Sequence, residues 1–239
     1  NNITGLGTGF INKGLMKYFL IFLYFISLRN SKKIFFQNLD DFNIFLKLSI
    51  INKNIAETIP GSGVNLKKFF FTPLFIKKDN ITFLFSGRML WHKGIRELVE
   101  AAVIIKKKYP RTMFKFIGFL DEQNKTSISR KQIKEWEDQN IIEYLGAKDE
   151  VRPLIAISDC IILPSYREGM SKSLLEAAAM GRPIIATNVP GCKEIVKHGE
   201  NGYICQPYSS KDLAKYIEKF ILLNSDIREK FSKKSFELA

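Results

Sequence analysis

The chain has 239 residues, of which 46% are hydrophobic and 26% are charged. This composition excludes an intrinsically disordered chain, and the length allows one large domain or one domain with part of another. The formal net charge of +13 predicts an anionic partner: a nucleic acid, a phosphorylated substrate or an anionic membrane surface.

The N-terminal part of the chain predicts few elements. A glycine-rich loop spans residues 1–14, an apolar helix follows, and then come a strand at 32–38 and a helix at 40–50. This is too little for a Rossmann-like domain, which needs on the order of 100–150 residues. We therefore expect residues 1–60 to be the remnant of a larger N-terminal domain and residues 61–73 to be a linker.

The apolar segment YFLIFLYFISL, residues 18–28, is too short to cross a bilayer, which requires about 20 residues. Three interpretations remain open: a helix buried in the protein or an interface, a helix lying on a membrane surface, and a transmembrane helix. The second is favoured by basic residues on both sides, namely Lys13, Lys17, Arg29, Lys32 and Lys33.

Residues 74–239 alternate between predicted strands and helices, which indicates an α/β domain. Strands are expected at Ile81–Arg88, Phe114–Phe119, Ile141–Ala147, Cys160–Ser165, Pro183–Val189 and 202–207. Helices are expected at Ile95–Pro110, 130–140, 149–159, 171–180 and 209–223. Continuously apolar strands of this kind are buried on both faces, which predicts a Rossmann-like, doubly wound parallel sheet.

The cysteines of this domain, Cys160, Cys192 and Cys205, lack C-x-x-C spacing. We expect them to be reduced thiols of a cytoplasmic protein. The two histidines, His92 and His198, have no neighbours that are typical of a zinc site.

Motif-bearing turns follow three of the predicted strands, at residues 87–94, 165–171 and 188–193. In parallel sheets of this kind ligands bind at the carboxyl ends of the strands. A helix beginning near Ser171 or Ser173 would offer free N–H groups to an anion. Gly169 would let the backbone approach that anion closely.

Two cations and two carboxylates complete the predicted site. Arg88 and Lys93, in the turn after the first strand, could grip a diphosphate from its other side. Glu168 and Glu176 lie eight residues apart, about 12 Å along a helix, which is the scale of a nucleotide sugar. Carboxylates accept hydrogen bonds from sugar hydroxyls. The alternative is structural: Glu176 closes a capping box with Ser173, and Glu168 is a solvated turn residue.

Three stretches resemble the C-terminal half of retaining glycosyltransferases of family four, which have the GT-B fold. They are FSGRMLWHKGIRELVEAA, PSYREGMSKSLLEAAAMGRPIIATNVPGCKEIV and HGENGYIC. The resemblance extends from about Ile59 to the C-terminus. Within the family, the sequence is similar to the subgroup that builds bacterial surface or lipid-linked glycans. The resemblance implies that residues 1–60 close an acceptor domain and that residues 74–239 bind the nucleotide sugar.

The resemblance also implies roles for individual residues. Arg88 and Lys93, in the turn opened by Gly87, would bind the donor diphosphate and stabilise the leaving UDP without a metal or other cofactor. Glu168 would hold hydroxyls of the donor sugar. On the nucleotide, Gly169, Met170 and Ser171 would offer backbone N–H groups to the phosphates, Glu176 would bind the ribose, and the loop Gly146–Lys148 would border the base.

The implied activity is transfer of a hexose or N-acetylhexosamine from a UDP-sugar to a lipid-linked or polysaccharide acceptor in bacterial surface glycan synthesis. The protein would be cytoplasmic, with a possible peripheral contact at the inner face of the plasma membrane, and would bind no nucleic acid. The family's acceptor site, its glycine-rich donor loop and its catalytic-region histidine are not found here, and His92 is expected to be a plain loop residue. Alone, this chain would bind donor weakly and transfer little or nothing.

Three alternatives remain open. A UDP-sugar 2-epimerase shares the architecture but requires acid and base residues that the sequence does not display. A nucleic-acid-binding module would explain the charge, although the aromatic residues lie in apolar runs rather than among arginines. A non-catalytic remnant could bind a nucleotide or a protein partner.

Overall fold

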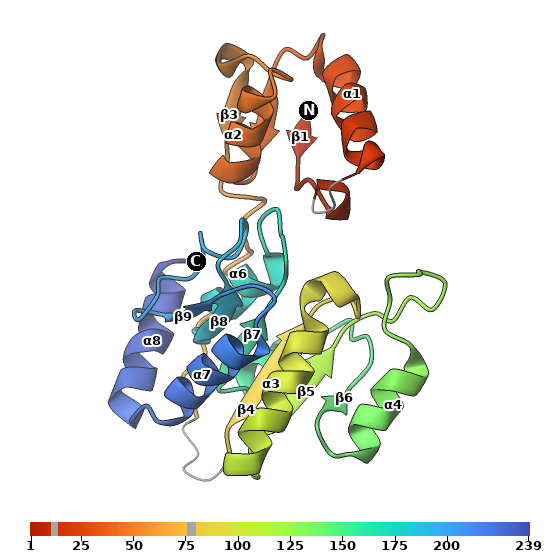
Figure 1. Cartoon of the computed structure of the whole chain (residues 1–239). Helices are drawn as coiled ribbons and strands as arrows, with labels where there is room; N and C mark the ends of the chain where they lie inside the picture. The colour runs from red at the N-terminus through yellow and green to blue at the C-terminus, as the bar shows by residue number, and fades with distance from the viewer. Residues whose placement is uncertain (11–13, 76–79) are drawn as a thin grey trace.

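The computed structural model describes residues 1–10, 14–75 and 80–239. Two α/β units lie one above the other in Figure 1, joined by the segment between β3 and β4. We call the unit that ends with β3 at Thr58 the N-lobe, and the unit that begins with β4 at Thr82 the C-domain. Each unit has its own hydrophobic core, one of ten buried residues and one of more than forty.

The N-lobe holds a small parallel sheet in the order β1-β2-β3. Its elements are β1 (Asn2–Ile3), the 3-10 helix η1 (Thr8–Phe10), α1 (Leu15–Leu28), β2 (Ile34–Phe36), α2 (Leu39–Lys47), η2 (Lys53–Ile55) and β3 (Ala56–Thr58). The expected helix–strand–helix series is therefore confirmed. The strands β1 and β3 were not predicted, since two or three residues are too few to display an alternating pattern.

Helix α1 exposes most of its apolar residues. Leu28 is its one buried residue, whereas Phe19, Phe22 and Ile26 are more than half exposed. The interpretation of α1 as a helix buried within this chain is therefore wrong. Within the described ranges no helix is long and apolar enough to cross a membrane. Lys13, one of the flanking basic residues, lies outside the described residues.

The C-domain sheet has six parallel strands in the order β6-β5-β4-β7-β8-β9. The strands are β4 (Thr82–Ser86), β5 (Met113–Ile117), β6 (Glu143–Tyr144), β7 (Cys160–Leu163), β8 (Ile184–Thr187) and β9 (Gly202–Cys205). The prediction of a doubly wound parallel sheet is confirmed. Winding reverses between β4 and β7, and this switch point is where such sheets bind ligands.

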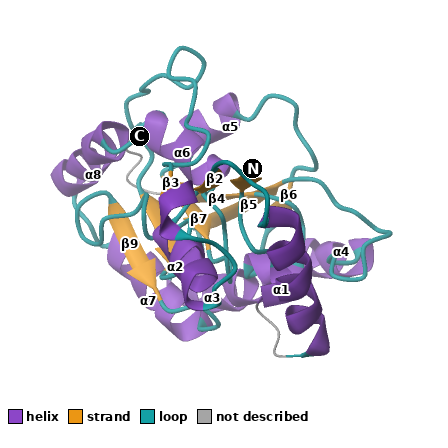
Figure 2. Cartoon of the chain, turned by 90° about the horizontal axis from the view of Figure 1, so that it is seen from above, coloured by secondary structure: helices purple, strands orange, loops and turns teal. Residues whose placement is uncertain are grey.

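Helices cover both faces of this sheet (Figure 2). They are η3 (Trp91–Lys93), α3 (Ile95–Lys108), α4 (Arg130–Asp138), α5 (Arg152–Ala156), α6 (Lys172–Ala179), α7 (Ser210–Ile221) and α8 (Ser225–Glu237). Helix α3 packs against α7 on one face and α6 against α8 on the other. Every residue of β7 and β8 is buried between these layers, which explains their unbroken apolar sequence.

The three cysteines are free thiols, as predicted, and all are buried in the C-domain. Burial raises the pKa of Cys205 to about 12 and raises the pKa values of Cys160 and Cys192 well above their usual range. These thiols are therefore protonated and act as small apolar side chains.

The buried Arg182 binds the segment between β3 and β4, which we call the interlobe segment, to the C-domain. The Arg182 guanidinium is fully buried and donates to the carbonyl oxygens of Thr72, Ala156 (3.0 Å), Ser158 (3.2 Å) and Met180 (3.2 Å). Burial lowers its pKa to about 10, so the group stays cationic at neutral pH. Because Thr72 lies in the interlobe segment, the contact fixes where that segment leaves the C-domain.

Candidate active site

The turns after β4 and β7 meet at the switch point of the sheet. Gly94 ends the first turn in a left-handed conformation with φ 72°, and a Cβ there would lie 2.0 Å from the Pro164 carbonyl oxygen. This close approach brings the second turn alongside. The Nζ atom of Lys93 then lies 2.5 Å from Oε1 of Glu168, with both side chains about 15% exposed or less. Two residues that were predicted for one site are thus in direct contact.

His92 lies among the charged residues of this site. Burial lowers the pKa of its imidazole, Lys93 and Arg88 lower it further, and Glu168 acts in the opposite direction. All three charges are therefore close enough to act on one ring, although Arg88 itself is exposed. The Nδ1 atom is buried and has no hydrogen-bond partner among the described residues.

His92 lies in η3, within the turn between β4 and α3, as predicted for a loop residue. Any role of its ring in the site stays a prediction.

The start of α6 is tied to the loop after β8. The backbone N–H of Glu168 donates to the Pro190 carbonyl at 3.1 Å, and the N–H of Ser171 donates to the Gly191 carbonyl at 3.0 Å. Ser171 is the N-cap, and its hydroxyl accepts from the N–H of Leu174 at 3.4 Å. The Ser171 N–H, expected to bind phosphate, is therefore already used within the protein. The backbone N–H groups that remain free to donate at the N-terminus of α6 belong to the first turn of the helix.

The capping-box interpretation of Glu176 is wrong. That motif requires the glutamate three residues after the N-cap, but the N-cap is Ser171 rather than Ser173. Glu176 lies in the second turn, with a side chain 14% exposed and its Oε1 3.8 Å from Nζ of Lys172. Burial raises the pKa of this carboxyl, while Lys172 and Lys68 act to lower it. Among the described residues, Lys172 is the ion-pair partner of this partly desolvated carboxylate.

Glycines line the carboxyl ends of β4, β5 and β6. A Cβ on Gly118 would lie 1.7 Å from the Gly87 carbonyl oxygen, and the Gly118 N–H donates to the Gly146 carbonyl at 3.0 Å. The predicted Gly87 turn and the Gly146–Lys148 loop are therefore joined through the end of β5. Lys148 is exposed at the outer side of this row.

Gly169 and Met170 face the N-lobe side of the site. A Cβ on Gly169 would lie 1.5 Å from the Thr4 carbonyl oxygen, so the N-lobe backbone rests directly on this glycine. Met170 is half-buried, and a Cβ on Gly61 would lie 2.6 Å from its Cγ. The site thus lies in the C-domain at its border with the N-lobe.

Residues 67–237 match the model of the family described as "Glycosyl transferases group 1". The chain belongs to this family. The match includes both turns of the site and the whole C-domain sheet.

One curated relative of this glycosyltransferase-family chain is the N,N'-diacetylbacillosaminyl-diphospho-undecaprenol alpha-1,3-N-acetylgalactosaminyltransferase of Campylobacter jejuni. It is 30% identical over 94% of the chain, and the alignment spans 60% of the relative's length. A capsular polysaccharide biosynthesis glycosyltransferase of Staphylococcus aureus is 28% identical over 74% of the chain and 50% of its own length.

Solved structures show the same GT-B fold. Sucrose-phosphate synthase of Thermosynechococcus elongatus superimposes with a TM-score of 0.82, at 22% identity, over 99% of the chain and 61% of that protein. Anabaena HepE, solved in complex with UDP, gives a TM-score of 0.81 at 17% identity, over 99% of the chain and 66% of that protein.

Proposed function

We propose that this chain carries the UDP-sugar site of a retaining glycosyltransferase that acts in bacterial surface glycan synthesis. The observation that carries the proposal is the contact between Lys93 and Glu168 at the switch point. Arg88 belongs to the same turn as Lys93, and the N-terminus of α6 follows in the same turn as Glu168. A cation pair, a carboxylate and a helix N-terminus at one point suit a ligand with both a diphosphate and hydroxyl groups.

In this proposal the diphosphate binds between two sources of positive charge. Arg88 and Lys93 approach it from the β4 turn, while the first turn of α6 and the backbone N–H groups of Gly169 and Met170 approach it from the β7 turn. As the bond to the sugar breaks, negative charge grows on the leaving UDP, and the two cations stabilise it. Since they supply the charge that a bound Mg²⁺ would supply, we expect no metal requirement.

The contact between Lys93 and Glu168 gives this site a defined state before the donor binds. When the diphosphate takes over the charge of Lys93, the Glu168 carboxylate becomes free to accept hydrogen bonds from hydroxyls of the donor sugar. Charge-assisted bonds of this kind contribute about 1.5–3 kcal/mol each. His92 beside them is neutral at pH 7, because burial and Lys93 lower its pKa, and it adds polarity without competing for the phosphate.

The nucleoside is assigned to the other side of α6. Glu176, partly desolvated in the second turn, would accept hydrogen bonds from the ribose hydroxyls, and the Gly146–Lys148 loop would border the base. We propose a lipid-linked or polysaccharide acceptor, because one relative is named for a lipid-linked acceptor and another for capsular polysaccharide biosynthesis.

Titration of the full chain with UDP in the presence of EDTA tests the proposal. We expect binding that EDTA leaves unchanged and that weakens on Glu176→Ala or Lys93→Ala. ADP serves as the matched control, because it has the same diphosphate and ribose but another base. A folded chain that binds neither nucleotide would contradict the assignment, and equal binding of both would contradict the choice of UDP.

A peripheral membrane contact through α1 is the second part of the proposal. The helix exposes Phe19, Phe22 and Phe25, which are 48–58% exposed, and Lys17 and Arg29 flank the apolar run. An apolar face with flanking cations suits the interface of an anionic bilayer. We expect vesicles that contain phosphatidylglycerol to retain the chain at low salt and a Phe22→Asp variant to be released. Equal retention of both proteins would contradict this contact.

A further inference from the structure

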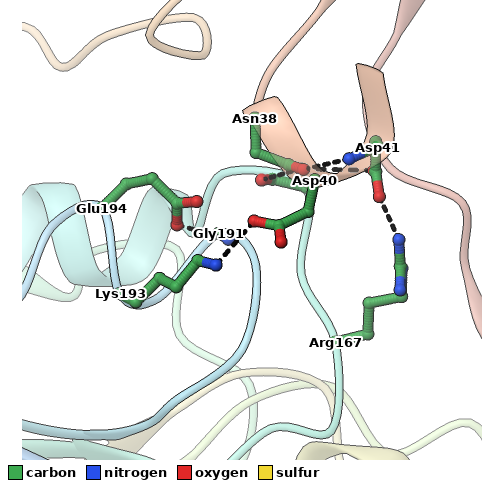
Figure 3. Close-up of polar contacts among 8 residues, drawn as sticks. Asn38, Asp40, Asp41, Arg167, Gly191, Lys193 and Glu194 are labelled. Atoms are coloured by element: carbon green, nitrogen blue, oxygen red, sulfur yellow. Dashed lines mark hydrogen bonds and ion pairs between the residues drawn. The ribbon is translucent and has the colours of Figure 1, made fainter. Parts of the chain in front are cut away.

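The start of α2 in the N-lobe contacts the turn that carries Glu168 (Figure 3). Arg167 forms an ion pair with Asp41, and the Nδ2 group of Asn38 donates to the Gly169 carbonyl oxygen at 2.9 Å. These two contacts hold the residues on either side of Glu168. The proposed function gives Glu168 a direct role on the donor sugar but leaves both contacts without one.

The local structure of α2 explains why Asn38 and Asp41 are rigidly placed. Asn38 is the N-cap, and its Oδ1 atom accepts from the backbone N–H of Asp41 at 2.8 Å. Its Nδ2 group also donates to Oδ2 of Asp41 at 3.2 Å. The negative carboxylate lies in the first helical turn, where the helix dipole stabilises it. A single cap thus orients both groups that contact the Arg167–Gly169 turn.

Burial separates this contact from its neighbour. The side chains of Asp41 and Arg167 are 1% and 15% exposed, whereas those of Asp40 and Lys193, which lie 2.7 Å apart, are each 38% exposed. Loss of one partner from a buried pair leaves an unpaired charge and is costly, whereas an exposed pair contributes little. Figure 3 shows that both pairs start from the first turn of α2, but Arg167 belongs to the turn after β7 and Lys193 to the loop after β8. Asp40 is therefore a matched control for Asp41: it also pairs with the C-domain, but not with the turn that carries Glu168.

The turn is held from two sides. From the C-domain, the Pro190 and Gly191 carbonyls accept from the N–H groups of Glu168 and Ser171. From the N-lobe, Asp41 pairs with Arg167 and Asn38 donates to the Gly169 carbonyl oxygen. The Thr4 backbone lies against Gly169. The conformation of the turn is therefore determined jointly by both units.

We infer that Asp41 and Asn38 are positioning residues, which act through Arg167 and the Gly169 carbonyl to hold the turn in the conformation that binds the nucleotide-sugar donor. The inference rests on the proposed donor site and adds that the N-lobe controls it. Neither residue needs to touch the donor. By thermodynamic linkage, a bound donor must stabilise the contact between the N-lobe and the C-domain by the same factor by which that contact strengthens donor binding.

The test compares Asp41→Asn, Arg167→Met, their double variant and the control Asp40→Asn in the full chain. Two quantities are measured: the Kd for UDP and the amide hydrogen exchange of a peptide covering residues 165–171. We expect Asp41→Asn and Arg167→Met each to weaken UDP binding by about fivefold or more and to speed exchange. The double variant should be no worse than either single variant, and Asp40→Asn should resemble the wild type.

Two further measurements separate positioning from loss of structure. Exchange of a peptide covering β2 reports whether the N-lobe stays folded, and Arg167→Lys, which keeps the charge, should recover part of the affinity. Wild-type exchange and affinity in both Asp41→Asn and Arg167→Met would overturn the inference, as would additive losses in the double variant. If the wild type binds no UDP, the proposed function fails, and the exchange of residues 165–171 alone decides whether the N-lobe holds the turn.

Discussion

Two carboxylates eight residues apart lie in different surroundings. The Glu168 carboxylate lies 2.5 Å from the ammonium group of Lys93. The Glu176 carboxylate is also largely buried, but the ammonium group of Lys172 is 3.8 Å away. The sequence predicted that both belong to one site, because charged residues at strand ends and helix starts have recognisable spacing. It did not predict the pairing of Lys93 with Glu168, since contacts between turns that are 75 residues apart depend on the fold.

Replacing Glu176 with glutamine is expected to stabilise the fold while it weakens binding at the proposed nucleotide site. The raised pKa of Glu176 means that the folded state prefers the protonated carboxyl, so stability is lost as pH rises from the group's ordinary pKa through the raised one. Glu176→Gln removes this loss. Urea unfolding measures this effect. Relative to the wild type, Glu176→Gln should have a larger free energy of unfolding at pH 7 and nearly the same one at pH 4. A variant less stable than the wild type at pH 7 would contradict this.

The same variant should bind UDP roughly tenfold more weakly, because a neutral amide replaces a charge-assisted acceptor. Calorimetry of the two proteins at one pH measures this difference. Unchanged affinity would remove Glu176 from the nucleotide site, whatever its effect on stability.

Lys93→Met leaves the Glu168 carboxylate without its partner in a place that is 13% exposed. We expect a loss of about 2 kcal/mol in the free energy of unfolding, between the values typical of exposed and of fully buried pairs. The double variant Lys93→Met, Glu168→Gln should recover part of that loss. If the losses of free energy of unfolding in Lys93→Met and in Glu168→Gln alone add up in the double variant, the pair contributes nothing to stability and the contact is incidental.

At the scale of elements, the helices and strands of the C-domain were predictable and those of the N-lobe were less so. Long apolar strands such as β7 carry a strong signal, whereas β1 and β3 are two and three residues long. The start of α6 was uncertain between Ser171 and Ser173. The structure selects Ser171, whose hydroxyl and backbone N–H are both used, and so places Glu176 in the second turn.

Helix α6 therefore depends on its cap. Ser171→Ala removes the hydroxyl that accepts from the Leu174 N–H, and we expect a loss of about 1 kcal/mol in the free energy of unfolding. Ser171→Asp is the matched control, since aspartate is an equally good cap. However, its negative charge should weaken UDP binding, while Ser171→Ala should not. If both variants bind UDP as the wild type does, the anion does not lie at this helix end.

At the scale of the whole molecule, the described residues connect the two units through polar contacts. The interlobe segment is fastened at Thr72 by Arg182, and α2 is fastened at Arg167 by Asp41. The glycine and proline content of residues 59–64 predicted a boundary near residue 60, but a buried arginine bound to backbone carbonyls has no sequence signature. Contacts between the two units were also not predictable, because they join segments more than 100 residues apart.

Arg182→Met should be the most destabilising of these changes. It removes a cation with 0% exposure and leaves several buried carbonyl oxygens without their donor, so we expect a loss of about 3 kcal/mol or more. Urea unfolding followed by tryptophan fluorescence measures the loss, because Trp91 and Trp136 both lie in the C-domain. Arg182→Lys restores the charge without the fork of donors and should recover only part of it.

The most direct test of the nucleotide assignment is a crystal structure of the full chain with UDP. We expect the diphosphate between Arg88, Lys93 and the first turn of α6, with the Glu176 carboxylate on the ribose and the Lys93–Glu168 contact opened. UDP bound elsewhere, with Lys93 still paired to Glu168, would contradict the donor site proposed for this member of the group 1 glycosyltransferases.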